Sequence, residues 1–217
     1  MSKAVRIVLV HAVTVAMEPV AASFAEHWPQ AELVNLLDDS LSLDRAADGE
    51  LTPAMTARFA ALTRYALDIH ARGILFTCSA FGDAIEAARA GLSLPVLKPN
   101  EAMFEAALAS GRKIAMLATF EPSVASMERE FRDLAARSGA SIETVCIPEA
   151  MAALKAGDAE RHNRLLAEAA AGLGDFDALM LAQFSTSRAL DAVSSVFRGP
   201  VLTSPGSAVE RLKRALT

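Results

Sequence analysis

The stretch Gly73-Ile74-Leu75-Phe76-Thr77-Cys78-Ser79-Ala80-Phe81-Gly82 decides the fold that we predict for this chain. Its apolar start is typical of a buried strand, and the small residues after it indicate a turn that leads into a helix. In open α/β sheets, ligands bind at the carboxyl ends of strands, which is where this stretch places Cys78. A helix N-terminus offers free N–H groups and partial positive charge, which lower the pKa of a thiol and hold a carboxylate. We therefore expect Cys78 to be an acid/base beside an anion site; the alternative is a small buried hydrophobe.

Short apolar runs alternate with longer amphipathic stretches along the whole chain. The expected strands are 5–10, 32–36, 73–77, 95–97, 113–118, 142–147, 178–182 and 200–203. The expected helices lie near 18–27, 53–70, 80–90, 100–109, 122–138, 159–173, 185–193 and 207–216. Nearly continuous apolar strands are typical of parallel sheets covered on both faces. The alternation therefore predicts an α/β fold with right-handed crossovers.

The two halves of the sequence also resemble each other. Leu94-Pro95-Val96-Leu97 matches Gly199-Pro200-Val201-Leu202 at a shift of 200 − 95 = 105 residues, and at that shift Cys78 aligns with Gln183. We predict two pseudo-symmetric flavodoxin-like lobes, each with a mostly parallel four-stranded sheet flanked by helices. The first lobe spans 1–98 and is joined by the C-terminal helix, about 205–217; the second spans 99–204. Cys78 and Gln183 are then expected on opposite walls of one cleft.

The composition argues against several classes of protein. The chain has 217 residues and a formal net charge of −5, so we do not expect a nucleic acid as partner. It is 53% hydrophobic, yet no apolar stretch is long enough to span a bilayer, so we expect no membrane association. The segment Met1–Val10 indicates a first strand rather than a signal peptide. The two cysteines, Cys78 and Cys146, do not suggest a disulfide framework, and a reducing cytoplasm is the simplest compartment.

Four segments, taken in order, resemble the aspartate/glutamate/hydantoin racemase superfamily. They are Ile74–Gly82, Pro95-Val96-Leu97 with Glu101-Ala102, Lys113–Thr119 with Pro122-Ser123-Val124, and Leu179–Thr186 with Pro200-Val201-Leu202. The segment Asn35–Leu41 is similar to a short-chain branch of that superfamily, and the chain is also similar to arylmalonate decarboxylase and maleate isomerase. The resemblance implies a cofactor-independent isomerase that acts at the carbon next to a carboxylate. It implies no metal.

The resemblance also implies roles for particular positions. Racemases of this superfamily use two cysteines, one in each lobe: one thiolate removes the alpha proton and the other thiol returns a proton to the opposite face. Cys78 matches the first position. The second, where the family has a Gly-Cys-Thr run, reads Ala182-Gln183-Phe184-Ser185, and an amide cannot exchange a proton near neutral pH. We expect Cys146, inside the strand 143–147, to be structural. The chain is therefore expected to work with a single cysteine acid/base.

Several polar residues near the expected strand ends are candidates for holding the substrate. Donors aimed at the carboxylate oxygens would stabilise the carbanion as an enediolate. The candidate ligands are Ser79, the amide of Ala80, Thr119, Gln183, Ser185 and Thr186. For the hydroxyl residues, helix capping is the alternative explanation. A second acid/base is sought in Ser185, Thr186, a water molecule or His11, since His11 also follows a strand and titrates near neutral pH.

Two other functions remain open from the sequence. A lyase that decarboxylates an activated malonate needs only one thiol, as the acid that reprotonates the carbanion; a covalent route through Cys78 belongs with it. A carboxylate-binding protein that has lost catalysis is the third hypothesis. A dinucleotide site is disfavoured, because the turn after Val10 has no Gly-rich loop. The expected partner is a small carboxylate-bearing substrate, with a homodimer or higher homo-oligomer left open.

A cluster of acids and two of the histidines carry simpler expectations. Asp38, Asp39 and Asp44 follow the second expected strand, and we expect them in a solvated loop rather than at a metal. His70 and His162 are expected to be exposed residues of helices.

Overall fold

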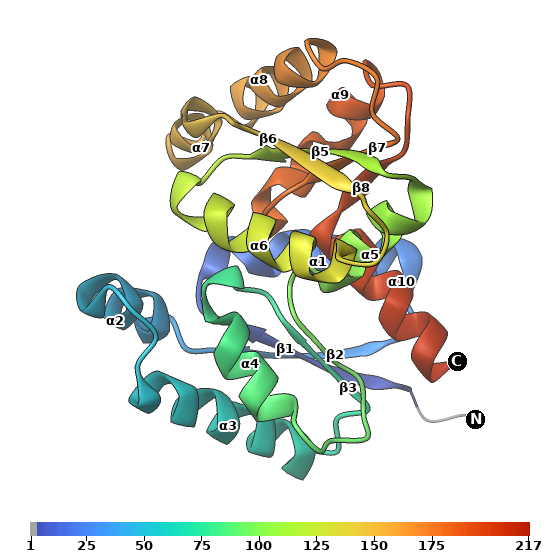
Figure 1. Cartoon of the computed structure of the whole chain (residues 1–217). Coiled ribbons are helices and arrows are strands. Elements are labelled where there is room, and N and C mark those ends of the chain that lie inside the picture. Colours follow the sequence, from blue (N-terminus) through green and yellow to red (C-terminus); the bar gives the residue numbers. More distant parts are fainter. Residues whose placement is uncertain (1–3) are drawn as a thin grey trace. The chain divides into compact units, whose positions relative to one another are not determined.

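Two four-stranded parallel sheets form the framework of the computed structural model, which describes residues 4–217 (Figure 1). The first sheet has the order β2-β1-β3-β4 and the second the order β6-β5-β7-β8. The strands are β1 Arg6–His11, β2 Glu32–Leu37, β3 Gly73–Phe76, β4 Val96–Leu97, β5 Lys113–Ala118, β6 Ser141–Cys146, β7 Ala178–Leu181 and β8 Val201–Thr203. The predicted fold class, two similar parallel α/β lobes, is confirmed. Residues 1–3 of the expected N-terminal strand segment lie outside the described residues.

Ten α-helices in the described part of the chain connect and cover the strands. They are α1 Met17–His27, α2 Ser40–Asp48, α3 Pro53–Asp68, α4 Gly82–Arg89, α5 Glu101–Ser110, α6 Val124–Ala135, α7 Pro148–Lys155, α8 Ala159–Ala171, α9 Leu190–Ser194 and α10 Ser204–Leu216. Short 3₁₀ turns precede four of them: η1 Thr14–Ala16, η2 Ser79–Phe81, η3 Glu121–Ser123 and η4 Phe184–Ala189. Each 3₁₀ turn follows β1, β3, β5 or β7, the two central strands of each sheet. The positions just after the central strands are therefore tight turns rather than the first residues of long helices.

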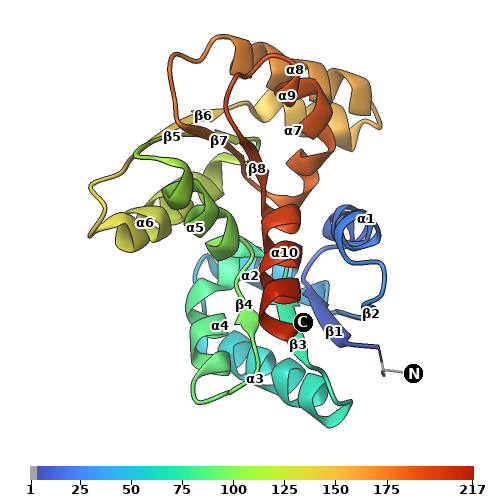
Figure 2. The same ribbon diagram turned by 90° about the vertical axis from the view of Figure 1, so that its right-hand side faces the viewer.

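The chain divides into two compact units. Unit 1 consists of the chain up to Pro99 together with Ala208–Thr217, and unit 2 is Asn100–Ser207. Helix α5 follows β4 but belongs to unit 2, whereas α10 runs directly on from β8 and belongs to unit 1 from Ala208 onward (Figure 2). The chain thus passes from one unit to the other twice, at Pro99 and at Ser207.

In unit 1, helices cover both faces of the sheet. One face packs against α3 and α4 through side chains such as Met55, Phe59 and Ile85. The other face carries α10, since a Cβ added at Gly73 of β3 would lie 3.1 Å from Leu212 Cδ2 and 3.2 Å from Leu216 Cδ1. Both faces bury apolar strand residues, which explains why the strand sequences are almost continuously apolar.

Unit 2 repeats this arrangement with its own helices (Figure 1). One face of its sheet packs on α5 and α6, where the rings of Phe104 and Phe131 meet edge to face with centroids 5.7 Å apart. The opposite face packs on α7, α8 and α9 through Ala150, Leu166 and Val193. Strand β5 lies at the centre with all but its first residue buried.

Replacing Gly73 with alanine is expected to destabilise unit 1 by about 1–3 kcal/mol, because the new methyl group overpacks the contact between β3 and α10. Its Cβ would meet Ile7, Leu212 and Leu216 side-chain carbons at 3.1–3.2 Å. Urea unfolding would measure the change in the free energy of unfolding. Gly174→Ala is the matched control, since a Cβ there meets nothing within 4 Å. Equal effects of both substitutions would contradict the close packing at Gly73.

Two expectations about local structure are wrong. The expected loop for the acids after β2 is wrong for Asp44, which lies in α2 (Ser40–Asp48), whereas Asp38 and Asp39 precede that helix; Arg58 of α3 pairs with Asp38 and Asp44. The guanidinium of Arg58 offsets part of the negative charge of this segment. Within residues 4–217, no group of three or more His, Cys, Asp or Glu side chains is arranged to hold a metal ion. His162 is fully buried on the inner face of α8, not exposed.

The same residues 4–217 contain no helix with both the length and the apolar character needed to cross a bilayer.

Candidate active site

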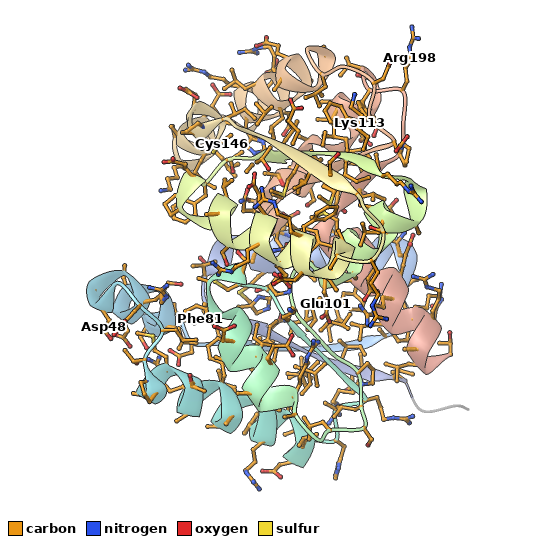
Figure 3. The ribbon with its side chains drawn as sticks, in the orientation of Figure 1. Asp48, Phe81, Glu101, Lys113, Cys146 and Arg198 are labelled. Atoms are coloured by element: carbon orange, nitrogen blue, oxygen red, sulfur yellow. The ribbon has the colours of Figure 1, made fainter. Side chains whose placement is uncertain are left out.

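Cys78 lies two residues after Phe76, the last residue of β3, in an extended backbone conformation with φ −119° and ψ 121°. The thiol is half-buried and packs partly against the apolar cluster of unit 1. The turn η2 follows, and Phe81 at its end is fully buried, with its ring centroid 4.9 Å from that of Phe59. Figure 3 labels Phe81 at the start of α4. The packed Phe81 ring therefore fixes the turn η2, which directly follows Cys78.

Burial raises the pKa of the Cys78 thiol above its ordinary value, and a hydrogen bond from the Ala80 backbone N–H offsets part of that rise. The lowered pKa that we expected from a helix N-terminus is therefore wrong. The physical reason is that α4 begins only at Gly82, two residues later than the helix expected from residue 80, while the apolar packing around the thiol removes water. In the free protein at neutral pH the thiol is protonated.

The imidazole of His11, the last residue of β1, bonds to a residue of β2 and to the residue that follows β3. Its Nδ1 lies 3.0 Å from the hydroxyl of Thr77, the residue before Cys78, and its Nε2 lies 2.9 Å from Oδ1 of Asn35 on β2. A neutral ring that donates from Nε2 to Asn35 and accepts at Nδ1 from Thr77 satisfies both bonds. Burial lowers the pKa of His11, which favours that neutral form. Both ring nitrogens are thus engaged within the unit.

His162 is the second buried imidazole, in α8 of unit 2. Its Nδ1 lies 2.8 Å from Oδ1 of Asn163, while Nε2 is buried without a hydrogen-bond partner among the described residues. Burial lowers the pKa of His162, and the positive charge of Arg188 adds to the effect.

The two buried histidines predict that the protein loses stability as the pH falls below about 6.5. Their folded-state pKa values are lowered, so below the unfolded value of about 6.5 the unfolded chain binds more protons than the folded one. Each group can then cost up to about 1.4 kcal/mol per pH unit until its folded pKa is reached. Urea unfolding between pH 7.5 and 5.5 would measure the slope. His11→Asn and His162→Asn should each flatten it; an unchanged slope in both variants would contradict the assignment.

Gln183 occupies in unit 2 the position that Cys78 occupies in unit 1. The backbone N–H of Thr77 donates to the Val10 carbonyl at 3.0 Å, and the N–H of Ala182 donates to the Leu117 carbonyl at 2.9 Å. The residues that follow these matching bonds are Cys78 and Gln183. Unlike Cys78, Gln183 has a positive φ of 66° with ψ 147°, a backbone conformation that residues other than glycine rarely adopt.

The side chain of Gln183 is bonded at both ends to the turn after β5. Its Oε1 accepts from the Thr119 backbone N–H at 3.1 Å and from the Thr119 hydroxyl at 3.4 Å. Its Nε2 donates to the Ser123 hydroxyl at 2.9 Å. The donors of Thr119 that we expected to face a substrate are therefore already bonded inside unit 2.

The remaining candidate hydroxyls differ in what they bind. Thr186 is fully buried and donates to the backbone carbonyls of Ala182 and Gln183, the latter at 2.7 Å. Ser79 and Ser185, by contrast, make no hydrogen bond through their side chains to any residue between 4 and 217. Each unit therefore offers one serine hydroxyl close to its central strand end that has no internal partner.

Comparison with known proteins shows the family of this chain. The model of the family described as Asp/Glu/Hydantoin racemase matches residues 10–175, which include Cys78 and stop short of Gln183. The chain belongs to the Asp/Glu/Hydantoin racemase family. Racemases are isomerases, so the family assignment also gives the class of enzyme. No curated protein matches the chain significantly.

Solved structures of this racemase family share the fold. The aspartate racemase of Picrophilus torridus is 15% identical with a TM-score of 0.72, over 97% of this chain and 94% of that one. The allantoin racemase of Klebsiella pneumoniae is 17% identical with a TM-score of 0.67, over 99% and 91% of the two chains. The glutamate racemase of Thermus thermophilus, solved with beta-chloro-D-alanine, is 21% identical with a TM-score of 0.68, over 99% and 82%.

Three polar partners of the candidate site in this racemase-family chain were missed from the sequence. Asn35 and Thr77 bind His11, and Ser123 binds Gln183. Thr77 directly follows an apolar strand and Asn35 is a polar residue between apolar residues of β2, which is the signal that could have found them. Cys146, labelled in Figure 3, ends β6 and packs partly against the apolar cluster of unit 2.

A surface hollow of about 380 Å³ contains none of the predicted site residues; it is lined by Leu36, Asp38, Arg58, Ala61, Leu62 and Tyr65.

Proposed function

We propose that this protein catalyses cofactor-independent proton transfer at the carbon alpha to a carboxylate, a racemisation or isomerisation with Cys78 as its single cysteine acid/base. The observation that carries the proposal is the place of the thiol. Cys78 stands at the carboxyl end of a central parallel strand, half-buried, in a chain of the racemase family. Ligands of open α/β sheets bind at such strand ends. The expected substrate is a small molecule that bears a carboxylate.

The neighbours of the thiol support this role. The Ala80 N–H stabilises the thiolate, and the Ser79 hydroxyl, which has no internal partner among the described residues, can donate to a substrate oxygen. In the carbanion that forms on proton removal, negative charge moves onto the carboxylate oxygens. Donors held there lower the barrier because they are oriented before the reaction.

The protonated resting state of Cys78 shapes the chemistry. The thiol has to lose its proton before it can abstract one from the substrate, and the substrate's alpha proton has to be acidified by the donors around the carboxylate. The product then needs a proton on the opposite face. Of the candidates for that step, His11 and Thr186 have their polar atoms bonded inside their own units, whereas the Ser185 hydroxyl is unbonded within the described chain. The donor that we propose is a water molecule.

Exchange of substrate hydrogen with solvent tests the proposal. Small carboxylic acids with one alpha proton, including amino acids and hydantoin-derived acids, would be incubated with the protein in deuterated water and followed by proton NMR and chiral chromatography. Loss of the alpha-proton signal together with formation of the other enantiomer supports racemisation. Absence of exchange for every acid, with binding retained, would overturn it in favour of a protein that binds carboxylates without turning them over.

Decarboxylation of an activated malonate is the second candidate, and two observations favour it. Gln183 supplies no thiol at the second position, and the protonated Cys78 is suited to deliver a proton to a carbanion formed by loss of carbon dioxide. The pH dependence of kcat/KM separates the two. Proton abstraction by the thiolate predicts a rise of about tenfold per pH unit up to the thiol pKa, whereas reprotonation by the thiol predicts a flat profile that falls above it.

A further inference from the structure

In unit 2, the side chain of Gln183 makes hydrogen bonds that a bound ligand could make. An amide oxygen and a carboxylate oxygen accept hydrogen bonds with similar geometry, and Oε1 of Gln183 takes both the N–H and the hydroxyl of Thr119. The amide nitrogen is held at the same time by Ser123 at 2.9 Å, with Met127 Sδ at 3.8 Å. The half-buried side chain therefore fills the polar corner formed by the turn after β5.

The backbone of Gln183 is held in an uncommon conformation to achieve this. Its φ of 66° and ψ of 147° fall where residues other than glycine are rare, and such a conformation persists only when the surroundings fix it. The side-chain bonds to Thr119 and Ser123 are one such restraint. The carbonyl of Gln183 is another, since it accepts from the Thr186 hydroxyl at 2.7 Å. Thr186 anchors the backbone, so the side chain alone is left to swing away from Thr119.

We propose that Gln183 is a gate: its amide closes a carboxylate subsite made by the Thr119 N–H and the Thr119 hydroxyl, and an incoming carboxylate displaces it. A charged carboxylate makes stronger hydrogen bonds than a neutral amide, so the exchange favours the ligand once the glutamine has moved. The affinity of the subsite is lowered by the fraction of molecules in which the gate is closed. The inference rests on the proposed function for its ligand class, a small carboxylate.

A binding experiment on the Thr119 amide tests the gate directly. The protein would be labelled with ¹⁵N-threonine, the Thr119 resonance assigned by its loss in Thr119→Ser, and sodium malonate titrated at constant ionic strength. Gln183→Ala removes the internal oxygen and is expected to tighten malonate binding at Thr119 by about tenfold. Gln183→Glu keeps the length but supplies an internal carboxylate, and is expected to weaken binding by at least about tenfold. Gln30→Ala, at an exposed glutamine of unit 1, should change nothing.

Further variants and outcomes keep the test decisive. If Gln183→Ala does not fold, Gln183→Gly serves instead, because glycine tolerates the positive φ. Equal malonate affinities in wild type, Gln183→Ala and Gln183→Glu would overturn the gate, as would a Thr119 resonance that malonate does not move in any variant. Either result leaves exchange by Cys78 standing if that exchange is observed. If the malonate affinities of the variants are ordered as expected but hydrogen exchange does not depend on Cys78, the proposed function is overturned and the gate stands.

Discussion

Replacing Cys78 with alanine is expected to lower hydrogen exchange at the alpha carbon of the substrate by about 10²–10⁴-fold, because a positioned acid/base contributes that much and the chain has no second thiol at the matching position. Cys78→Ser should lose a similar factor, since a hydroxyl is a far weaker acid than a thiol although it fills nearly the same space. Exchange into deuterated water, followed by NMR on the best substrate of the panel, measures the effect. The free energy of unfolding, measured in parallel, shows that the variants are folded.

Cys146→Ser is the matched control for this experiment. Cys146 is half-buried like Cys78, and burial raises the pKa of its thiol as well. Its surroundings differ, however, because the carboxylates of Glu121 and Glu149 also repel a thiolate there. We expect exchange within about twofold of wild type in this variant. A Cys146→Ser protein as inactive as Cys78→Ala, or a Cys78→Ser protein with full activity, would contradict the assignment of the acid/base.

The framework of the fold could be predicted because its central strands are buried on both faces. Runs such as Lys113–Ala118 have no polar side to blur their limits, and the structure places β5 at those residues. The repeat of 105 residues could be found for the same reason: both units use the same strand order and the same register at the end of their central strands. The short helices α2 and α7 were missed because their stability comes from packing and from distant partners, as with the pairing of Arg58 to Asp38.

The place of Cys78 in the fold could be predicted from the sequence, but the pKa of its thiol could not. The sequence predicts Cys78 close to the end of a strand, and the structure has it there. The pKa of its thiol, however, depends on packing by residues distant in sequence. Likewise, nothing next to Gln183 in the sequence shows that it binds Thr119. The burial of His162 could have been found, since His162, Leu166 and Ala170 recur every four residues and mark one face of α8.

Replacing Phe81 with alanine is expected to cost about 3–5 kcal/mol in the free energy of unfolding, the largest stability effect that we predict near the thiol. The ring of Phe81 is fully buried and stacks in tilted geometry on Phe59, which itself lies 5.3 Å from Phe76 of β3. Truncation leaves a cavity that the sheet and α3 cannot fill without moving. Urea unfolding measures the loss, with the m-value reported to show whether the units still unfold together.

Phe120→Ala is the control for Phe81, because the Phe120 ring is 48% exposed and its removal should change stability by no more than about 0.5 kcal/mol. A second measurement tests whether the packing of Phe81 affects the thiol. Alkylation of Cys78 by iodoacetamide, followed by mass spectrometry, should be faster in Phe81→Ala than in wild type. Water that enters the cavity lowers the desolvation that now raises the thiol pKa. Phe81→Leu should give an intermediate result on both scales. Alkylation at the wild-type rate in a destabilised Phe81→Ala protein would show that the thiol pKa is set by neighbours other than this ring.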